Sequence, residues 1–343
     1  MLVLGIETSC DETAAAVVVA GSLVRSNVVS SQLDHAAYGG VVPEIAARRH
    51  VEALPSVVAA AFDEAGVEWS DIDGIGVTRG PGLVGALLAG WCYARGAARS
   101  LGIPYVGVNH LAAHVHGALM PVLETGDRVA YPLLALIVSG GHTTLYRLPS
   151  ETEFRRAGDT LDDAAGEAFD KVATLLGLGY PGGPIIDRIS DGGDAGAVAL
   201  PRARLESPFD FSFSGLKAAV RREAMRQELE PWVAGDPVDP RILDLVASFQ
   251  CAVLDMLESA TDAALRRFPA RGLVVAGGVA ANRGLRARME GLAARHDLPL
   301  YLSPLELSTD NAAMIAGDAH RRLAAGEADP FDQTVRARWP LSA

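Results

Sequence analysis

Apolar positions along the first 110 residues switch between two spacings. Short apolar runs bounded by polar or turn residues predict strands, and apolar side chains at helical spacing predict amphipathic helices. The predicted strands are residues 2–7, 14–19, 23–29, 72–77 and 105–109, and the predicted helices are residues 43–65 and 83–101. This order of elements predicts one mixed-sheet α/β unit.

The pattern recurs loosely after residue 130. Two strands form a hairpin around the turn at residues 139–142, and strands and helices follow. The predicted strands are residues 133–139, 143–148, 273–276 and 300–302, and the predicted helices are about 163–176, 214–228, 241–267 and 310–324. Because both halves open with a strand–turn–strand, the sequence predicts a duplicated fold with a cleft between two lobes, a usual place for ligands.

Composition narrows the class of protein. The 343 residues suffice for about two domains, and no apolar run approaches the roughly 18 residues of a membrane span. The opening MLVLGIET reads as a strand and not as a signal peptide. The three scattered cysteines argue against a disulfide framework, so we expect a cytoplasmic protein with no membrane contact. A net charge of -12 disfavours nucleic-acid binding by this chain alone.

Two histidines lie four residues apart in Asn109-His110-Leu111-Ala112-Ala113-His114. Positions i and i+4 share one face of a helix, so both imidazoles could hold one metal ion, as in zinc-binding helices. The alternative is two helix histidines with no shared ligand. His116 follows six residues after His110 and is expected to point elsewhere.

A third metal ligand is offered by Ser308-Thr309-Asp310-Asn311, which precedes an apolar helical run. A carboxylate there would complete a His-His-Asp set with open coordination positions, which suits a Lewis-acid metal such as iron or zinc. The alternative is an ordinary helix N-cap.

Glycine-rich turns and an acidic segment mark the second half. The turns at 138–143, 180–184 and 276–282 expose backbone N–H groups that can cradle phosphate or acyl oxygens, and Asn282 could bind an adenine edge or a ribose hydroxyl. In the acidic segment 162–171, Asp170 could hydrogen-bond a ligand. The alternatives are structural turns and a solvated acidic helix face.

Ten short motifs are spread over nearly the whole chain. They are GIETSCDET (5–13), YGGVVPEIAAR (38–48), GPGLVGALL (80–88), NHLAAH (109–114), VSGGHT (138–143), DDAAGEAFDKVA (162–173), GYPGGP (179–184), FSFSGLK (211–217), GGVAAN (277–282) and STDNAAMIA (308–316). No single motif is decisive. The ordered set closely resembles the tRNA threonylcarbamoyltransferase family of the sugar-kinase/actin/heat-shock-ATPase superfamily.

The resemblance implies an α/β fold of two RNase-H-like lobes with an interlobe cleft. We place the N-terminal lobe at residues 1–130, the C-terminal lobe at 131–325 and a tail at 326–343. An alternative is that the last helix packs back on the first lobe.

The resemblance also implies the ligands and the reaction. One divalent metal per subunit, usually Fe²⁺ and sometimes Zn²⁺, would be held by His110, His114 and Asp310. The implied adenylate pocket consists of Ile137, Val138, Ser139, Gly140, Gly141, Asp170, Gly183, Asp187 and Asn282. The donor would be threonylcarbamoyl-adenylate, and the acceptor the N6 amine of the adenosine 3′ of the anticodon in tRNAs reading ANN codons, with release of AMP.

Acyl transfer to an exocyclic amine requires positioning and a base. The amine is a poor nucleophile and the mixed anhydride a good electrophile, so holding the two together does most of the work. A carboxylate must accept the amine proton. Asp11 and Glu12, on the first turn, are our candidates, and ordinary turn acids are the alternative.

Members of the family work with partner proteins, so the resemblance implies partners for this chain as well. A paralogous subunit (TsaB-like) would pack on the first lobe, a small ATPase (TsaE-like) would join it, and a separate synthase would make the adenylate.

Two residues depart from the family pattern: Ala47, where Ser is frequent, and Arg79, where a small residue is frequent. Both departures bear on the surface of the first lobe that faces tRNA or a partner.

Three rival functions fit the sequence less well. A zinc peptidase needs a glutamate directly after the first histidine, where this chain has Leu111. A sugar kinase or chaperone ATPase needs an acid on the second phosphate turn, which reads Ser139-Gly140-Gly141-His142. A silent scaffold paralogue is expected to lack the histidine pair and Asp310.

Overall fold

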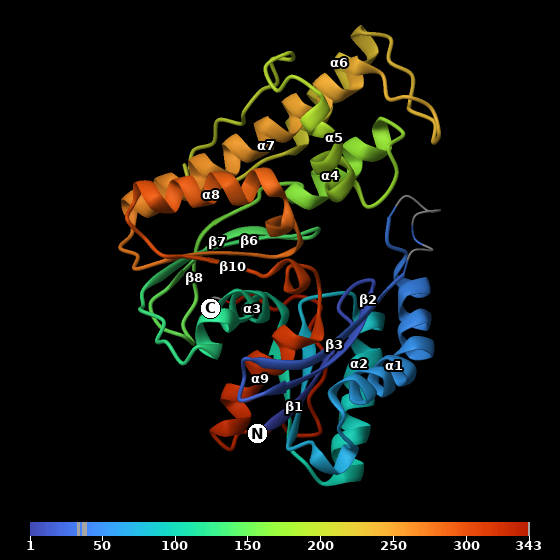
Figure 1. The fold of residues 1–343 in the computed structure, drawn as a ribbon, viewed down its shortest axis with the longest axis vertical. Helices are drawn as coiled ribbons and strands as arrows, with labels where there is room; N and C mark the ends of the chain where they lie inside the picture. The colour runs from blue at the N-terminus through green and yellow to red at the C-terminus, as the bar shows by residue number, and fades with distance from the viewer. Residues whose placement is uncertain (33–34, 36–39, 342–343) are drawn as a thin grey trace. The chain divides into compact units, whose positions relative to one another are not determined.

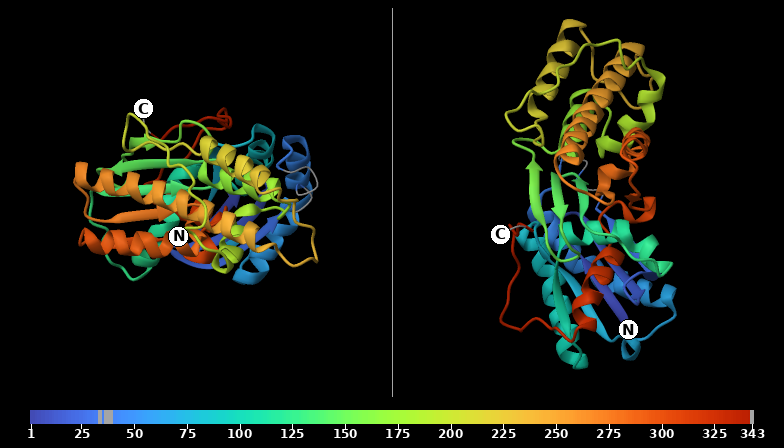
Figure 2. Two further views of the ribbon diagram at one scale, coloured as in Figure 1. Left: turned by 90° about the horizontal axis from the view of Figure 1, so that it is seen from above. Right: turned by 90° about the vertical axis from the view of Figure 1, so that its left-hand side faces the viewer.

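The computed structural model describes residues 1–32, 35 and 40–341. The chain forms two compact units (Figures 1 and 2): unit 1 is Met1–Val129 with Ser303–Ala343, and unit 2 is Ala130–Leu302. The division thus falls after Leu302 and not at the expected residue 325, because the last helix packs on the sheet of unit 1. Residues 38 and 39 of the second motif lie outside the described residues.

Unit 1 is built on a five-stranded sheet with the order β3-β2-β1-β4-β5. Its elements are β1 (Leu2–Glu7), β2 (Glu12–Val19), β3 (Leu23–Ser31), α1 (Pro43–Ala65), η2 (Trp69–Asp71), β4 (Gly74–Gly80), α2 (Val84–Leu101), β5 (Tyr105–Asn109), α3 (His110–Glu124), η5 (Leu305–Leu307) and α9 (Ala312–Ala324). β1 runs parallel to β4, and β4 parallel to β5, whereas β2 is antiparallel to both of its neighbours. The carboxyl ends of β1, β4 and β5 therefore meet at one edge of the sheet.

The two faces of this sheet carry different helices. Leu4 and Ile6 pack with α1 and α2, whereas Val3 packs with α3 and α9. Figure 1 shows these four helices around the sheet. α9 comes close because Gly5 has no side chain: a Cβ there would lie 2.1 Å from the backbone oxygen of Ala312. Burial on both faces explains why β1 and β2 read as continuous apolar runs.

The segment after α9, red in Figure 2, runs along the edge strand β5. Asp329 donates its backbone N–H to the Tyr105 oxygen at 2.8 Å, and its carboxylate accepts the N–H of Gly107 at 2.7 Å. The Asn109 side chain donates to the Trp339 oxygen at 2.9 Å. The segment therefore covers backbone groups that an edge strand would otherwise expose.

Arg79 holds this segment in place. Its Nε donates to the Thr334 oxygen at 2.8 Å, and its guanidinium lies over the rings of Trp91 and Trp339. Losing one partly exposed hydrogen bond and two cation–π contacts costs about 1–2 kcal/mol. We expect Arg79→Ala to lower unfolding stability by that amount and to speed amide exchange in residues 329–339. Unchanged exchange there would contradict this role.

Unit 2 repeats the topology of unit 1. Its elements are β6 (Leu133–Val138), β7 (Thr143–Leu148), β8 (Arg155–Asp159), α4 (Ala165–Leu175), α5 (Gly182–Ile189), η3 (Ser190–Gly192), α6 (Ser214–Arg226), α7 (Pro240–Arg267), β9 (Leu273–Ala276), η4 (Gly278–Ala281), α8 (Arg283–Arg295) and β10 (Leu300–Leu302). The strand order is β10-β9-β6-β7-β8, with β6 parallel to β9 and antiparallel to β7. This confirms the predicted duplication and adds β8 and α5, which the pattern did not predict.

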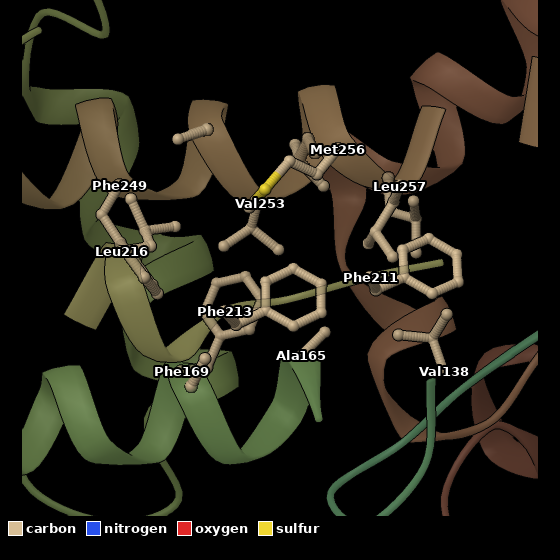
Figure 3. Close-up of a cluster of buried hydrophobic side chains, with 14 of the residues drawn as sticks. Val138, Ala165, Phe169, Phe211, Phe213, Leu216, Phe249, Val253, Met256 and Leu257 are labelled. Atoms are coloured by element: carbon tan, nitrogen blue, oxygen red, sulfur yellow. The ribbon is translucent and has the colours of Figure 1, made fainter. Parts of the chain in front are cut away.

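The helices of unit 2 share one aromatic core (Figure 3). Phe169 of α4 meets Phe249 of α7 edge to face, with ring centroids 5.4 Å apart, and Phe213 lies beside them. Aromatic pairs in this geometry add about 0.5–1.5 kcal/mol beyond burial. Phe169 thereby fixes α4, and with it the neighbouring Asp170. Among the described residues, no helix is both long and apolar enough to span a membrane.

Candidate functional site

The histidine pair lies at the first turn of α3, directly after β5. Asn109 is the N-cap, and its side chain accepts the backbone N–H groups of Leu111 and Ala112. Helix geometry then brings the rings of His110 and His114 to 4.6 Å between centroids. Both side chains are buried.

Asp310 completes a group of three. Its Oδ1 lies 3.4 Å from Nε2 of His110 and 3.2 Å from Nε2 of His114. Two ligand atoms that are each about 2.1 Å from one metal ion lie roughly 3.0–3.4 Å apart at tetrahedral or octahedral angles. The three side chains therefore fit a single divalent cation, and among the described residues they form the one such cluster.

The structure decides against one alternative interpretation, in which Asp310 would be the N-cap of the following helix. The N-cap of α9 is Asn311, whose side chain accepts the N–H of Met314 at 3.0 Å, so the Asp310 carboxylate is left to face the histidines. His116 points away, as expected, and its Nε2 lies 2.9 Å from the Gly21 oxygen.

Glu7, the last residue of β1, was missed as a site residue. Its carboxylate is fully buried, and Oε2 lies 2.9 Å from Nδ1 of His110. Thr78 donates its hydroxyl to the same oxygen at 2.6 Å, and the backbone N–H of Ser9 donates to Oε1. Sequence reasoning took Glu7 only as the polar end of a strand, although a carboxylate after five apolar positions is a signal of buried pairing.

The ionisable side chains of the cluster shift one another's pKa values. Burial opposes a charge on His110, but the carboxylates of Asp310 and Glu7 raise the pKa of His110 well above its ordinary value. Burial also opposes a charge on Asp310 and raises its pKa. The two histidines more than offset this effect and hold the pKa of Asp310 well below its ordinary value. Burial lowers the pKa of His114, which favours the neutral imidazole that a metal requires.

Asp11 ends the turn from β1 to β2 and Glu12 begins β2, at the same edge of the sheet. Burial, the nearby Asp310 carboxylate and a hydrogen bond with Asp11 raise the pKa of Glu12 well above its ordinary value. The turn is held by His50, whose Nε2 lies 3.0 Å from the Cys10 oxygen. The structure thus brings Glu12 close to Asp310, with Asp11 hydrogen-bonded to Glu12.

The phosphate-turn residues gather at one edge of the unit 2 sheet. Ile137 and Val138 end β6, and the Ser139-Gly140-Gly141 turn follows. β9 is parallel to β6 and ends beside it: a Cβ on Gly277 would lie 2.4 Å from the Val138 oxygen. Gly140 and Gly141 have open space where a side chain would be. This edge is the carboxyl end of parallel strands, where α/β sheets bind ligands.

Two of the remaining residues predicted for the adenylate pocket form contacts between helices. Asp170 accepts the N–H of Gly182 at 2.7 Å, which joins α4 to α5 beside the open Gly183. Asp187 pairs with Arg283, which the sequence reasoning missed, at 3.0 Å.

Asn282, next to Arg283, is already engaged within the chain. It caps α8 by accepting the N–H of Leu285 at 2.9 Å, and it donates to Oε1 of Gln250 at 2.9 Å. The other acidic side chains of the segment 162–171 are partly neutralised by ion pairs. Nζ of Lys171 lies 2.6 Å from Asp163 and 2.7 Å from Glu167.

Comparison with known proteins identifies the family. A sequence model described as tRNA N6-adenosine threonylcarbamoyltransferase matches residues 23–317. Relatives of that name from Trichlorobacter lovleyi and Sorangium cellulosum are 52% and 50% identical over 345 and 353 residues, each covering 99% of this chain and 97% of the relative.

Solved structures with lower identity share the fold. HypF of T. kodakarensis has a TM-score of 0.60 at 13% identity, covering 95% of this chain and 48% of that chain. Component A of (R)-2-hydroxyglutaryl-CoA dehydratase from Acidaminococcus fermentans has a TM-score of 0.52 at 16% identity, covering 94% and 99%. These similarities confirm the expected α/β fold. The family model and the relatives place the chain in the tRNA N6-adenosine threonylcarbamoyltransferase family, whose members are transferases that modify tRNA.

Proposed function

We propose that this protein moves the threonylcarbamoyl group from threonylcarbamoyl-adenylate to the N6 amine of the adenosine 3′ of the anticodon in tRNAs reading ANN codons, releasing AMP. The observation that carries the proposal is the convergence of His110, His114 and Asp310 on one point, beside the carboxylates of Asp11 and Glu12, in a chain of this family. The protein would act in the cytoplasm, where tRNA is modified.

The chemistry needs few protein groups. A bond forms between N6 and the carbamoyl carbon, the bond from that carbon to the phosphate oxygen breaks, and AMP departs. Asp11 or Glu12 takes the proton that N6 loses. A metal held by His110, His114 and Asp310, Fe²⁺ or alternatively Zn²⁺, would supply Lewis-acid polarisation of the donor.

The adenylate would be bound by unit 2. Backbone N–H groups of the turn at Ser139, Gly140 and Gly141 suit phosphate oxygens. Gly183 leaves room for the nucleotide, and Asp170 lies next to it. Asp187 and Asn282 act by fixing α5 and α8 around that space, since their side chains bond within the chain.

The test is nucleoside analysis of tRNA. Unmodified tRNA, the protein, its partners and supplied threonylcarbamoyl-adenylate should give threonylcarbamoyladenosine and AMP in equal amounts by mass spectrometry. A tRNA with guanosine 3′ of the anticodon is the control and should stay unmodified. AMP release without a modified nucleoside would refute the proposal.

A paralogous TsaB-like subunit is proposed to pack on α1 and α2 of unit 1, with a TsaE-like ATPase joining the complex. α2 packs on its own sheet and on α1, while other positions of both helices remain exposed. Val51 of α1 and Val84 and Leu88 of α2 are 65%, 51% and 39% exposed. Such an apolar surface fits a protein partner.

We expect Leu88→Arg to weaken this heterodimer at least about tenfold, because a charge would be buried at the contact. Sedimentation velocity of the mixed proteins measures it. Gly85 is a poorer position for a disrupting substitution, since a Cβ there would lie 3.0 Å from Ala47 and disturb α1. Leu101→Arg, at the far end of α2 with 38% exposure, is the matched control. If both variants formed the heterodimer equally well, the partner would bind a different surface of the protein.

A further inference from the structure

Glu7 is a buried carboxylate that the proposed reaction does not use. Its side chain is fully buried, and its three contacts are His110, Thr78 and the backbone of Ser9. Placing a charge in such a position is costly unless each oxygen is paired. The contacts with Thr78 and Ser9 only satisfy the hydrogen-bonding capacity of the carboxylate, whereas the contact with His110 reaches a candidate metal ligand.

We propose that Glu7 is a positioning residue of the metal centre. Its Oε2 lies 2.9 Å from Nδ1 of His110 and accepts the Nδ1–H, so Nε2, which faces the point shared with His114 and Asp310, is the nitrogen available to a metal. Carboxylates behind ligating histidines fix the ring and the tautomer in this way. The inference rests on the metal site proposed above.

Glutamine at this position makes the idea testable, because it has the same shape. If its Oε1 faces Ser9, as Oε1 of Glu7 does, its NH₂ group faces His110 and donates to Nδ1, which moves the ring proton to Nε2 and blocks that ligand. If the amide is flipped, its NH₂ group opposes the backbone N–H of Ser9. Neither orientation reproduces the wild-type arrangement.

The experiment measures Zn²⁺ affinity by competition with a chromophoric chelator, and the visible spectrum of the Co²⁺-loaded protein. Glu7→Gln should bind Zn²⁺ at least about tenfold more weakly, within the range found when groups behind metal ligands are removed. The Co²⁺ bands should change as well. Thr78→Val is the matched control: it removes the hydroxyl donor to the same Oε2 but keeps the carboxylate on His110, so its affinity should stay within about threefold.

The outcomes separate the two proposals. A wild-type protein that binds no Zn²⁺ would defeat the metal site itself. A wild-type protein that binds Zn²⁺, with Glu7→Gln binding equally well or Thr78→Val weakened as much, would defeat the role of Glu7. Long-range ¹H–¹⁵N NMR of the Zn²⁺-loaded wild-type protein needs no variant: coordination by Nε2 with a proton on Nδ1 of His110 is expected, and coordination by Nδ1 would overturn the inference.

Discussion

Asp310→Ala is expected to lose the bound metal and to slow threonylcarbamoyl transfer by at least about 100-fold. Changes behind a metal ligand alone cost about 10–100-fold in affinity or activity, and this substitution removes one of the three proposed ligands. It also leaves His110 and His114 facing each other in a buried site, with rings 4.6 Å apart. Elemental analysis of the purified protein measures the metal, and nucleoside analysis of tRNA measures the transfer.

His116→Ala is the control for this prediction. His116 is on the same helix, but its Nε2 bonds to the Gly21 oxygen, so metal content should stay at the wild-type level. His114→Ala should behave like Asp310→Ala, since its Nε2 faces the same Oδ1. Full metal occupancy in both Asp310→Ala and His114→Ala would show that the ion, if any, binds elsewhere.

The histidine pair could be predicted from sequence because its geometry is local. Helix periodicity alone puts His110 and His114 on one face and turns His116 away. Asp310 was harder, because Asp310 and Asn311 are both good N-cap residues and local sequence does not decide between them. The structure uses Asn311 as the cap, which leaves the carboxylate of Asp310 for the histidines.

Glu7 could not be assigned from sequence because its partner is distant in the chain. It is separated by 103 residues from His110 and by 71 from Thr78, and only the parallel order of β1, β4 and β5 brings the three together. The resemblance covered Glu7 within a motif but gave it no role. Long-range pairing of this kind needs the sheet order, which periodicity does not supply.

The missed elements lacked the expected signals. β8 has one buried residue among five, so no apolar alternation marked it. α5 begins with Gly182-Gly183-Pro184, which reads as a turn. The boundary at residue 325 followed chain order, whereas α9 packs on β1 because Gly5 and Gly76 leave room for it.

The residues proposed for the adenylate pocket of unit 2 divide into those that leave space and those whose side chains bond within the chain. Asn282 bonds to Leu285 and Gln250, so Asn282→Ala would change stability as well as ligand binding. Gly183 is a cleaner probe. It is the second residue of α5, and a side chain there would meet no atom within 4 Å. Adding bulk at Gly183 therefore obstructs a ligand without obstructing the fold.

We expect Gly183→Leu to weaken AMP binding by about 5- to 140-fold, because blocking one ligand contact costs about 1–3 kcal/mol and each 1.4 kcal/mol is tenfold. Gly215→Leu is the matched control: Gly215 is the second residue of α6, it has equally open space, and it lies outside the proposed pocket. Both variants should melt within a few degrees of the wild-type protein, so calorimetric titration with AMP compares folded proteins. Asp170→Ala should also weaken AMP binding, whether the carboxylate meets the ligand or only holds the N–H of Gly182. If Gly183→Leu bound AMP as tightly as Gly215→Leu, the nucleotide would not occupy the space beside α5, and the assignment of Asp170, Gly183 and Asp187 to the pocket would fail together.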